Sequence, residues 1–184
     1  MARQHNPRTY HNTAMLLPDG RVLVGGHSPI NTGYAYSLDL SALGLSPNQG
    51  RDPSFELYSP PYMYAANRPQ ITSAPSTTKL GESINIGTSG GNIKDVILVK
   101  RTTLTHIIDG DQRTVVLPHT GSGTLTAKLP TQEGVLPPGT YMLFVISEDA
   151  AGKRLPSVSV PIMVEGADDR AVGCSVPAAR VVKR

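Results

Sequence analysis

Three side chains stand out because their residue types, taken together, can hold a redox metal: Tyr10, His11 and His106. Tyr10 and His11 are neighbours, whereas His106 lies 95 residues after His11. Two imidazole nitrogens and a phenolate oxygen suit Cu(II), which favours square geometry. A metal ion also promotes ionisation of a phenol, whose ordinary pKa is about 10. The residue types are therefore compatible with a copper centre without requiring one.

Each of these residues also has a plain structural interpretation. Adjacent side chains of a regular strand face opposite sides, so Tyr10 and His11 can reach one point only where the backbone bends. Without a bend they are a partly exposed tyrosine and a surface histidine. His106 lies in the polar stretch LTHIIDGDQR (104–113), which favours a hydrogen-bonded loop braced by an Asp–Arg pair. The residues alone leave both interpretations open.

The remaining histidines and the one cysteine give weaker signals. His27 follows Gly25-Gly26 and can face the same site, although a solvated loop histidine is the favoured interpretation. Cys174 is the single cysteine, so it has no internal disulfide partner, and we interpret it as a free thiol in a tail. We assign no role to His5 or His119.

Composition and charge exclude several classes of protein. Hydrophobic residues make up 39% of the 184 residues and charged residues 17%, which excludes a chain disordered by its charge. The first ten residues, MARQHNPRTY, have no apolar core of the signal-peptide kind, and no apolar run comes near the ~20 residues that a transmembrane helix needs. The net charge is +3, but Lys and Arg are scattered along the chain, and the one tight cluster lies at residues 180–184. Nucleic-acid binding is therefore not expected.

The N-terminal part predicts one β-hairpin. Two apolar runs, Ala14–Leu17 and Arg21–Val24, flank a tight turn at Pro18-Asp19-Gly20. The following Gly25-Gly26 resembles the double glycine of kelch propeller blades. Because a propeller needs about four to eight blades and no second such unit occurs, the hairpin is predicted to be part of an incomplete blade.

The rest of the chain predicts an all-β organisation. A long irregular segment at 27–53 leads to a short strand at Ser54–Tyr58 and a proline-aromatic connector. Turn signals about every ten residues then favour an immunoglobulin-like antiparallel sandwich, with no helix longer than three turns. We expect a partial blade at 1–65, the sandwich at 66–165 and a flexible tail at 166–184. The predicted strands are Gln70–Ser73, Ser83–Thr88, Lys94–Lys100, Thr114–Leu117, Thr124–Leu129, Thr140–Ile146 and Ser157–Val164.

Four ordered motifs closely resemble the C-terminal region of the copper-radical oxidases, the family of galactose oxidase and glyoxal oxidase. The resemblance covers about residues 7–165, and it implies that the blade belongs to a seven-bladed kelch propeller followed by an early-set immunoglobulin-like domain. The motifs are RTYHNTAMLLPDGRVLVGG (8–26), FELYSPPYMYAANRPQIT (55–72), LTHIIDGDQR (104–113) and LPPGTYMLFVISEDAAGKRLPSVSV (136–160).

The resemblance also implies roles for the three residues. Tyr10 matches the axial tyrosine of the family's copper site and its general base, and His11 and His106 match the two equatorial histidines. Asp109, Gln112 and Arg113 are expected to brace the His106 loop. The family's second tyrosine, joined to a cysteine as the radical cofactor, comes from earlier blades and has no counterpart here; Cys174 does not match it.

The implied reaction is oxidation of a small alcohol, aldehyde or carbohydrate, with O₂ reduced to H₂O₂. Without the Cys–Tyr segment and the upstream blades, this chain alone is expected to bind Cu²⁺ weakly and to be inactive. The resemblance further implies a secreted or cell-surface protein.

A non-enzymatic kelch or immunoglobulin-like binding module is the alternative, because such folds often serve as scaffolds. The presence of all three ligand residues argues against it.

An incomplete blade also leaves an apolar face uncovered. The side chains of Leu16, Leu17, Val22 and Val24 are therefore expected to be partly exposed, and the chain is expected to associate.

Overall fold

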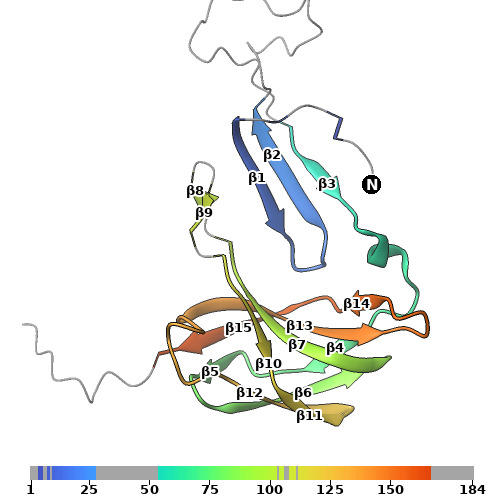
Figure 1. Ribbon diagram of the computed structural model, residues 1–184, viewed down its shortest axis with the longest axis vertical. Helices are drawn as coiled ribbons and strands as arrows, with labels where there is room; N and C mark the ends of the chain where they lie inside the picture. Colours follow the sequence, from blue (N-terminus) through green and yellow to red (C-terminus); the bar gives the residue numbers. More distant parts are fainter. Residues whose placement is uncertain are drawn as a thin grey trace, which may run out of the picture.

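The computed structural model describes residues 4–5, 8, 10–27, 54–102, 104–105, 108–110 and 112–166. Within these ranges the chain is built from β-strands, and its one helical element is the short 3₁₀ helix η2 (Pro61–Tyr64) (Figure 1). No helix among the described residues has the length and apolar character needed to cross a membrane. Of the irregular segment expected at 27–53 and the tail expected at 166–184, residues 28–53 and 167–184 lie outside the described residues.

The N-terminal strands form a small antiparallel sheet in the order β1-β2-β3. Its strands are β1 (Tyr10–Leu16), β2 (Val22–His27) and β3 (Glu56–Tyr58). The predicted hairpin is present, but both of its strands are longer than expected. Tyr10 therefore lies within β1 and not ahead of it, because the ladder with β2 continues past the apolar run that sequence periodicity detects.

The turn between β1 and β2 is closed by local hydrogen bonds. Gly20 N–H donates to Leu17 C=O at 2.9 Å, and Leu17 N–H donates to Arg21 C=O at 2.8 Å. Gly20 has a φ of 94°, which glycine adopts at little cost. The Asp19 carboxylate accepts from the Arg21 backbone N–H at 2.9 Å and from its Nε at 2.7 Å. The sequence Pro-Asp-Gly-Arg thus specifies this turn.

Two facing sheets make up the C-terminal sandwich (Figure 1). The larger has the order β10-β7-β13-β15-β5, with β14 paired to β13, and the smaller has the order β11-β12-β6-β4. The larger sheet contains β5 (Thr77–Lys79), β7 (Asn92–Lys100), β10 (Thr114–Leu117), β13 (Gly139–Glu148), β14 (Arg154–Pro156) and β15 (Val160–Glu165). The smaller contains β4 (Gln70–Ser73), β6 (Ser83–Ser89), β11 (His119–Ser122) and β12 (Thr124–Lys128).

The sandwich confirms the predicted all-β class and the seven expected strands, with shifted ends. The expectation of purely antiparallel pairing is wrong at one edge, where β5 pairs parallel to β15. Residues 157–159, expected to begin the last strand, instead link β14 to β15. Several short strands, β5 (TTK), β11 (HTGS) and β14 (RLP) among them, were not predicted, because they contain at most one aliphatic side chain and so show no apolar alternation.

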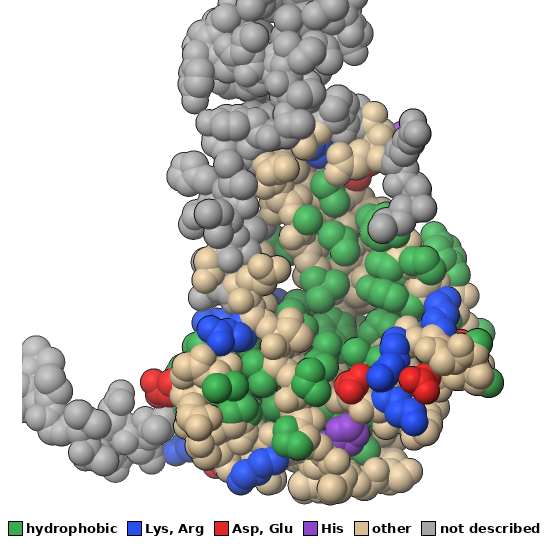
Figure 2. Space-filling model, viewed as in Figure 1, with side chains coloured by type: hydrophobic (Ala, Val, Ile, Leu, Met, Phe, Trp, Pro, Cys, Tyr) green, Lys and Arg blue, Asp and Glu red, His purple; other side chains and the backbone are tan. Residues whose placement is uncertain are grey.

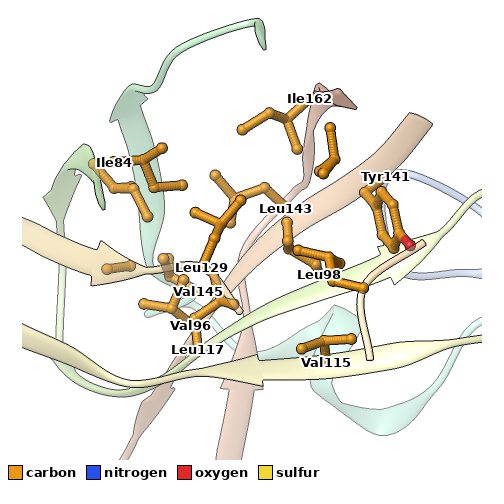
Figure 3. Close-up of a cluster of buried hydrophobic side chains, with 14 of the residues drawn as sticks. Ile84, Val96, Leu98, Val115, Leu117, Leu129, Tyr141, Leu143, Val145 and Ile162 are labelled. Carbon is orange, nitrogen blue, oxygen red and sulfur yellow. The ribbon is translucent and has the colours of Figure 1, made fainter. Parts of the chain in front are cut away.

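The hydrophobic core lies between the two sheets, as Figure 3 shows. Strand β13 supplies Tyr141, Leu143 and Val145, and each of these side chains is fully buried. Its intervening residues Met142 and Phe144 point to the opposite face of the sheet by strand alternation, and they too are buried. The three-stranded sheet lies on that side of β13 in Figure 1. Strand β13 is thus covered on both faces, which accounts for its nearly continuous apolar sequence.

Replacing Tyr141 by Phe is expected to lower the free energy of unfolding by about 0.5–1.5 kcal/mol, because it removes a partly buried hydrogen bond. The Tyr141 hydroxyl donates to Pro137 C=O at 2.6 Å, four residues upstream, in the manner of the tyrosine corner of immunoglobulin-like sandwiches. Urea unfolding measures the effect. Tyr64→Phe is the control, because that ring is 81% exposed. Equal midpoints for the two variants would contradict the prediction.

Apolar side chains remain partly exposed on the three-stranded sheet, as expected. Leu16, Leu17, Val22 and Val24 are all of intermediate exposure. Hydrophobic side chains gather over this sheet in Figure 2, and Leu57 in β3 is 43% exposed. The expected tendency to associate stays a prediction.

Candidate metal centre

The backbone of Tyr10 and His11 lies at an irregularity of the β1–β2 ladder. Tyr10 pairs with His27 and Thr13 pairs with Gly25, so His11 and Asn12 together face the single residue Gly26. Two residues opposite one define a β-bulge, which bends the strand and redirects its side chains. This is the kind of bend that adjacent tyrosine and histidine ligands need in order to reach one point.

Gly26 is required at this place for two reasons. Its φ of 130° is one that residues with a side chain rarely adopt. A Cβ atom at Gly26 would lie 2.6 Å from the Asn12 Cα and 3.0 Å from the Asn12 Cβ. The second glycine of the Gly25-Gly26 pair therefore permits the close approach of the strands beside His11.

A buried arginine fixes the chain just before β1. The Arg8 side chain has no exposed surface, and its Nη1 donates to Gly26 C=O and to Ser54 C=O, each at 2.9 Å. Its Nη2 donates to Ser54 Oγ at 2.9 Å, and its Nε lies 3.5 Å from a carboxylate oxygen of Glu56. Arg8 thus ties the entry of β1 to the end of β2 and to the beginning of β3.

His27 lies in a strand, contrary to the favoured interpretation of a loop histidine. It is the last residue of β2 and the ladder partner of Tyr10. Residues that pair across an antiparallel ladder have neighbouring Cβ atoms. The structure therefore brings the His27 backbone to the Tyr10 position, which sequence spacing alone could not show.

His106 belongs to the connection between strands β7 and β10. Residues 101–113 make up this connection, and at its base the Lys100 N–H donates to Arg113 C=O at 2.9 Å. Within it β8 (Leu104–Thr105) pairs with β9 (Ile108–Asp109), which replaces the predicted irregular loop by a small hairpin. In Figure 1 this hairpin extends out of the sandwich on the side where the three-stranded sheet lies.

The structure describes the backbone of Tyr10 and His11, two of the three expected copper ligands. His106 lies outside the described residues, and so do the side chains of Tyr10, His11, His27 and Asp109. Among the side chains that are described, no three His, Cys, Asp or Glu residues gather as a metal site. Of the three residues expected to brace the His106 loop, Arg113 has a described side-chain hydrogen bond, and it runs to Gly134 C=O at 2.9 Å, outside that loop, so the brace stays a prediction. Cys174 also lies outside the described residues.

The three-stranded sheet and the sandwich, which carry different members of the expected donor set, meet at a polar junction. We call it the Arg68 junction, and it contains Pro18–Gly20, Tyr62, Arg68 and Pro156–Ser159. The Ser159 N–H donates to Pro18 C=O at 2.8 Å, and the Tyr62 hydroxyl donates to Gly20 C=O. The tip of the β1–β2 hairpin is therefore bonded directly to the sandwich.

Titratable groups at the Arg68 junction have shifted pKa values. Burial raises the pKa of Tyr62, although the Arg68 charge partly opposes the shift. Burial also acts to raise the pKa of Asp19, but hydrogen bonds from the Arg21 backbone and side chain outweigh it and leave that pKa lowered. Tyr62 thus keeps its proton and donates it, while Asp19 stays ionised within its turn.

Comparison with known proteins identifies relatives over most of the chain. The chain is 32% identical over 165 residues to galactose oxidase from Gibberella zeae, covering 85% of this chain and 21% of the relative. It is 32% identical over 157 residues to aldehyde oxidase GLOX from Vitis pseudoreticulata, covering 77% of this chain and 28% of the relative. The chain therefore spans about a fifth to a quarter of the length of these curated relatives.

A solved structure and a family model give the same relationship. The fold matches a fungal alcohol oxidase of the AA5 family, solved in complex with copper, with a TM-score of 0.70 and 26% identity. The match covers 89% of this chain and 32% of that one. Residues 68–164 match the family model described as the galactose oxidase-like early set domain. The chain belongs to the galactose oxidase-like family, and its sandwich is the early set domain of that family.

Proposed function

We propose that this chain is the C-terminal part of a copper-radical oxidase that converts an alcohol to an aldehyde, or an aldehyde to an acid. Two electrons and two protons leave the substrate, and O₂ takes them up as H₂O₂; aldehyde oxidation also consumes water. The proposal is carried by one combination: family membership, together with the ligand-type residues Tyr10 and His11 beside a bulge and His106 in the sequence between the paired strands β8 and β9.

The donor types and the backbone bend fit copper. His11 and His106 would supply neutral imidazole nitrogens, and Tyr10 would supply a phenolate oxygen. Copper, when bound, supplies one-electron redox chemistry and favours ionisation of oxygen ligands. Tyr10 as phenolate would then accept the proton of a substrate hydroxyl group, as a general base. The second redox equivalent would come from a Cys–Tyr radical in a longer protein that contains the upstream blades of a kelch propeller.

His106→Ala is expected to abolish tight copper binding in that longer protein, because the site loses one of two imidazoles. Tyr10→Phe is expected to lower peroxide production far more than copper content, since it removes the proposed base and keeps both histidines. Copper content and H₂O₂ release measure the two effects.

The 184-residue chain alone is expected to bind Cu(II) weakly and to release no H₂O₂.

His119→Ala is the matched control, because His119 lies in β11 of the smaller sheet and has no proposed role. If His106→Ala keeps the copper content and peroxide production of the unchanged protein, the ligand assignment is wrong. The scaffold alternative would then gain, and the partly exposed apolar side chains of β1 to β3 would be its binding surface. By the same family relationship we propose a secreted or cell-surface location.

A further inference from the structure

One arginine connects the three-stranded sheet to the sandwich through backbone carbonyls of both. The Arg68 Nη2 donates to Asp19 C=O at 2.8 Å, at the tip of the β1–β2 hairpin. It also donates to Ser157 C=O at 3.0 Å, and Arg68 Nε donates to Pro156 C=O at 2.8 Å. A planar guanidinium group presents its donors in a fixed fork, so these three carbonyls hold one relative orientation.

The aromatic residue of the Arg68 junction reinforces this orientation. The Arg68 guanidinium carbon lies 5.6 Å from the centre of the Tyr62 ring, within cation–π range. The hydroxyl group of the same ring donates to Gly20 C=O. Arg68 and Tyr62 thus both contact the hairpin tip, and Arg68 also contacts the end of β14.

The Arg68 junction joins the tip of the β1–β2 hairpin to the sandwich, and each of these two parts carries some of the proposed copper ligands. Tyr10 and His11 belong to β1, whereas His106 belongs to the connection that leaves the sandwich at β7. We infer that Arg68 is a positioning residue that holds these two parts of the copper site at a fixed separation. The inference rests on the proposed function only for its copper readout.

The separation of the two parts can be measured without copper. Spin labels are placed at Ala14→Cys in β1 and Thr124→Cys in β12, both exposed positions, in a chain that also carries Cys174→Ser. Pulsed dipolar EPR then gives the distribution of label distances. Arg68→Ala is expected to broaden this distribution about twofold, because relative motion is the default for two units without a firm interface. An unchanged distribution overturns the inference.

Two further variants make the measurement specific. Arg154→Ala is the matched control, because Arg154 is exposed and pairs with Asp95 and Glu148 within one sheet, so its removal should leave the distribution unchanged. Arg68→Lys keeps the charge but not the fork, and it should broaden the distribution to a smaller extent. It also preserves the test if Arg68→Ala does not fold. Equal broadening by Arg154→Ala would overturn the inference.

The Cu(II) EPR spectrum gives a second readout, besides activity. The unchanged chain, at Cu(II) concentrations that populate a weak site, is expected to show hyperfine coupling to two imidazole nitrogens. Arg68→Ala should lose the coupling to one of them and so reproduce the spectrum of His106→Ala. If Arg68 only stabilises the fold, Arg68→Ala should lower the intensity of the Cu(II) signal without changing the number of coupled nitrogens. That result would overturn the inference. If the Cu(II) spectrum of the unchanged chain lacks coupling to two imidazole nitrogens, the proposed ligands are wrong. The distances between the spin labels would then still decide the role of Arg68.

Discussion

Gly26→Ala is expected to disrupt the open end of the β1–β2 hairpin and to abolish copper binding with it. The added methyl group would lie 2.6 Å from the Asn12 Cα, a backbone atom that cannot move aside without opening the ladder. Strain at a φ of 130° costs on the order of 1–3 kcal/mol, and overpacking against backbone adds a similar amount. His11 and Asn12 share the bulge opposite Gly26, so their geometry should change first.

Amide hydrogen exchange measures this effect in the metal-free chain. We expect faster exchange at Tyr10–Thr13 and at Gly25–His27, with β13 amides unchanged. Gly25→Ala is a closely matched control, because a Cβ there would lie 3.5 Å from the Thr13 Cγ2, an ordinary contact. The prediction is wrong if both alanine variants exchange alike. Loss of Cu(II) binding in Gly26→Ala and not in Gly25→Ala would tie the bulge to the site.

Sequence reasoning succeeds here where structure is decided by neighbouring residues. Pro18-Asp19-Gly20 was predicted to be a turn, and the Asp19 carboxylate makes it one through bonds two residues away. A second Gly-Gly pair in the sequence, Gly90-Gly91, forms a turn between strands. Both glycines have positive φ values, 77° and 74°, and they link β6 to β7.

Sequence reasoning fails where a long-range partner decides the structure. Strand β5 has three residues, and its pairing with β15 joins segments that are more than eighty residues apart. Arg68 and Arg8 look like two of many single basic residues in the sequence, yet both bind backbone carbonyls of distant segments. Charge counts describe the surface, and they do not reveal which arginine is buried.

The candidate site is divided in the same way. Residue types suggested Tyr10, His11 and His106, and the family resemblance assigned their roles, but spacing could not show the bulge at His11 or the strand position of His27. The bulge depends on Gly26 across the ladder, which is a contact between strands and not a local pattern. These residues remain a predicted copper site.

Arg8→Ala is expected to loosen the end of the three-stranded sheet at which Tyr10 and His11 lie. The guanidinium group donates to Gly26 C=O and Ser54 C=O, so its removal takes one donor from each of these carbonyls. It also removes the cation beside Glu56, whose side chain is only 22% exposed. Breaking a buried ionic group of this kind costs about 3–5 kcal/mol, and the partial exposure of Glu56 favours the lower end.

Because Arg8 connects three segments, its removal should affect all of them together. Hydrogen exchange should accelerate together at Val22–Gly26 and at Glu56–Tyr58, because the end of β2 and the start of β3 lose a shared donor. Arg113→Ala removes an exposed arginine that bonds a single described carbonyl, and it should leave both strands unchanged. Arg8→Lys separates charge from geometry: one ammonium group can face Glu56, but it cannot reproduce the fork to Gly26 and Ser54. Exchange in Arg8→Lys as slow as in the unchanged chain would show that charge alone suffices, and the geometric role assigned to Arg8 would be wrong.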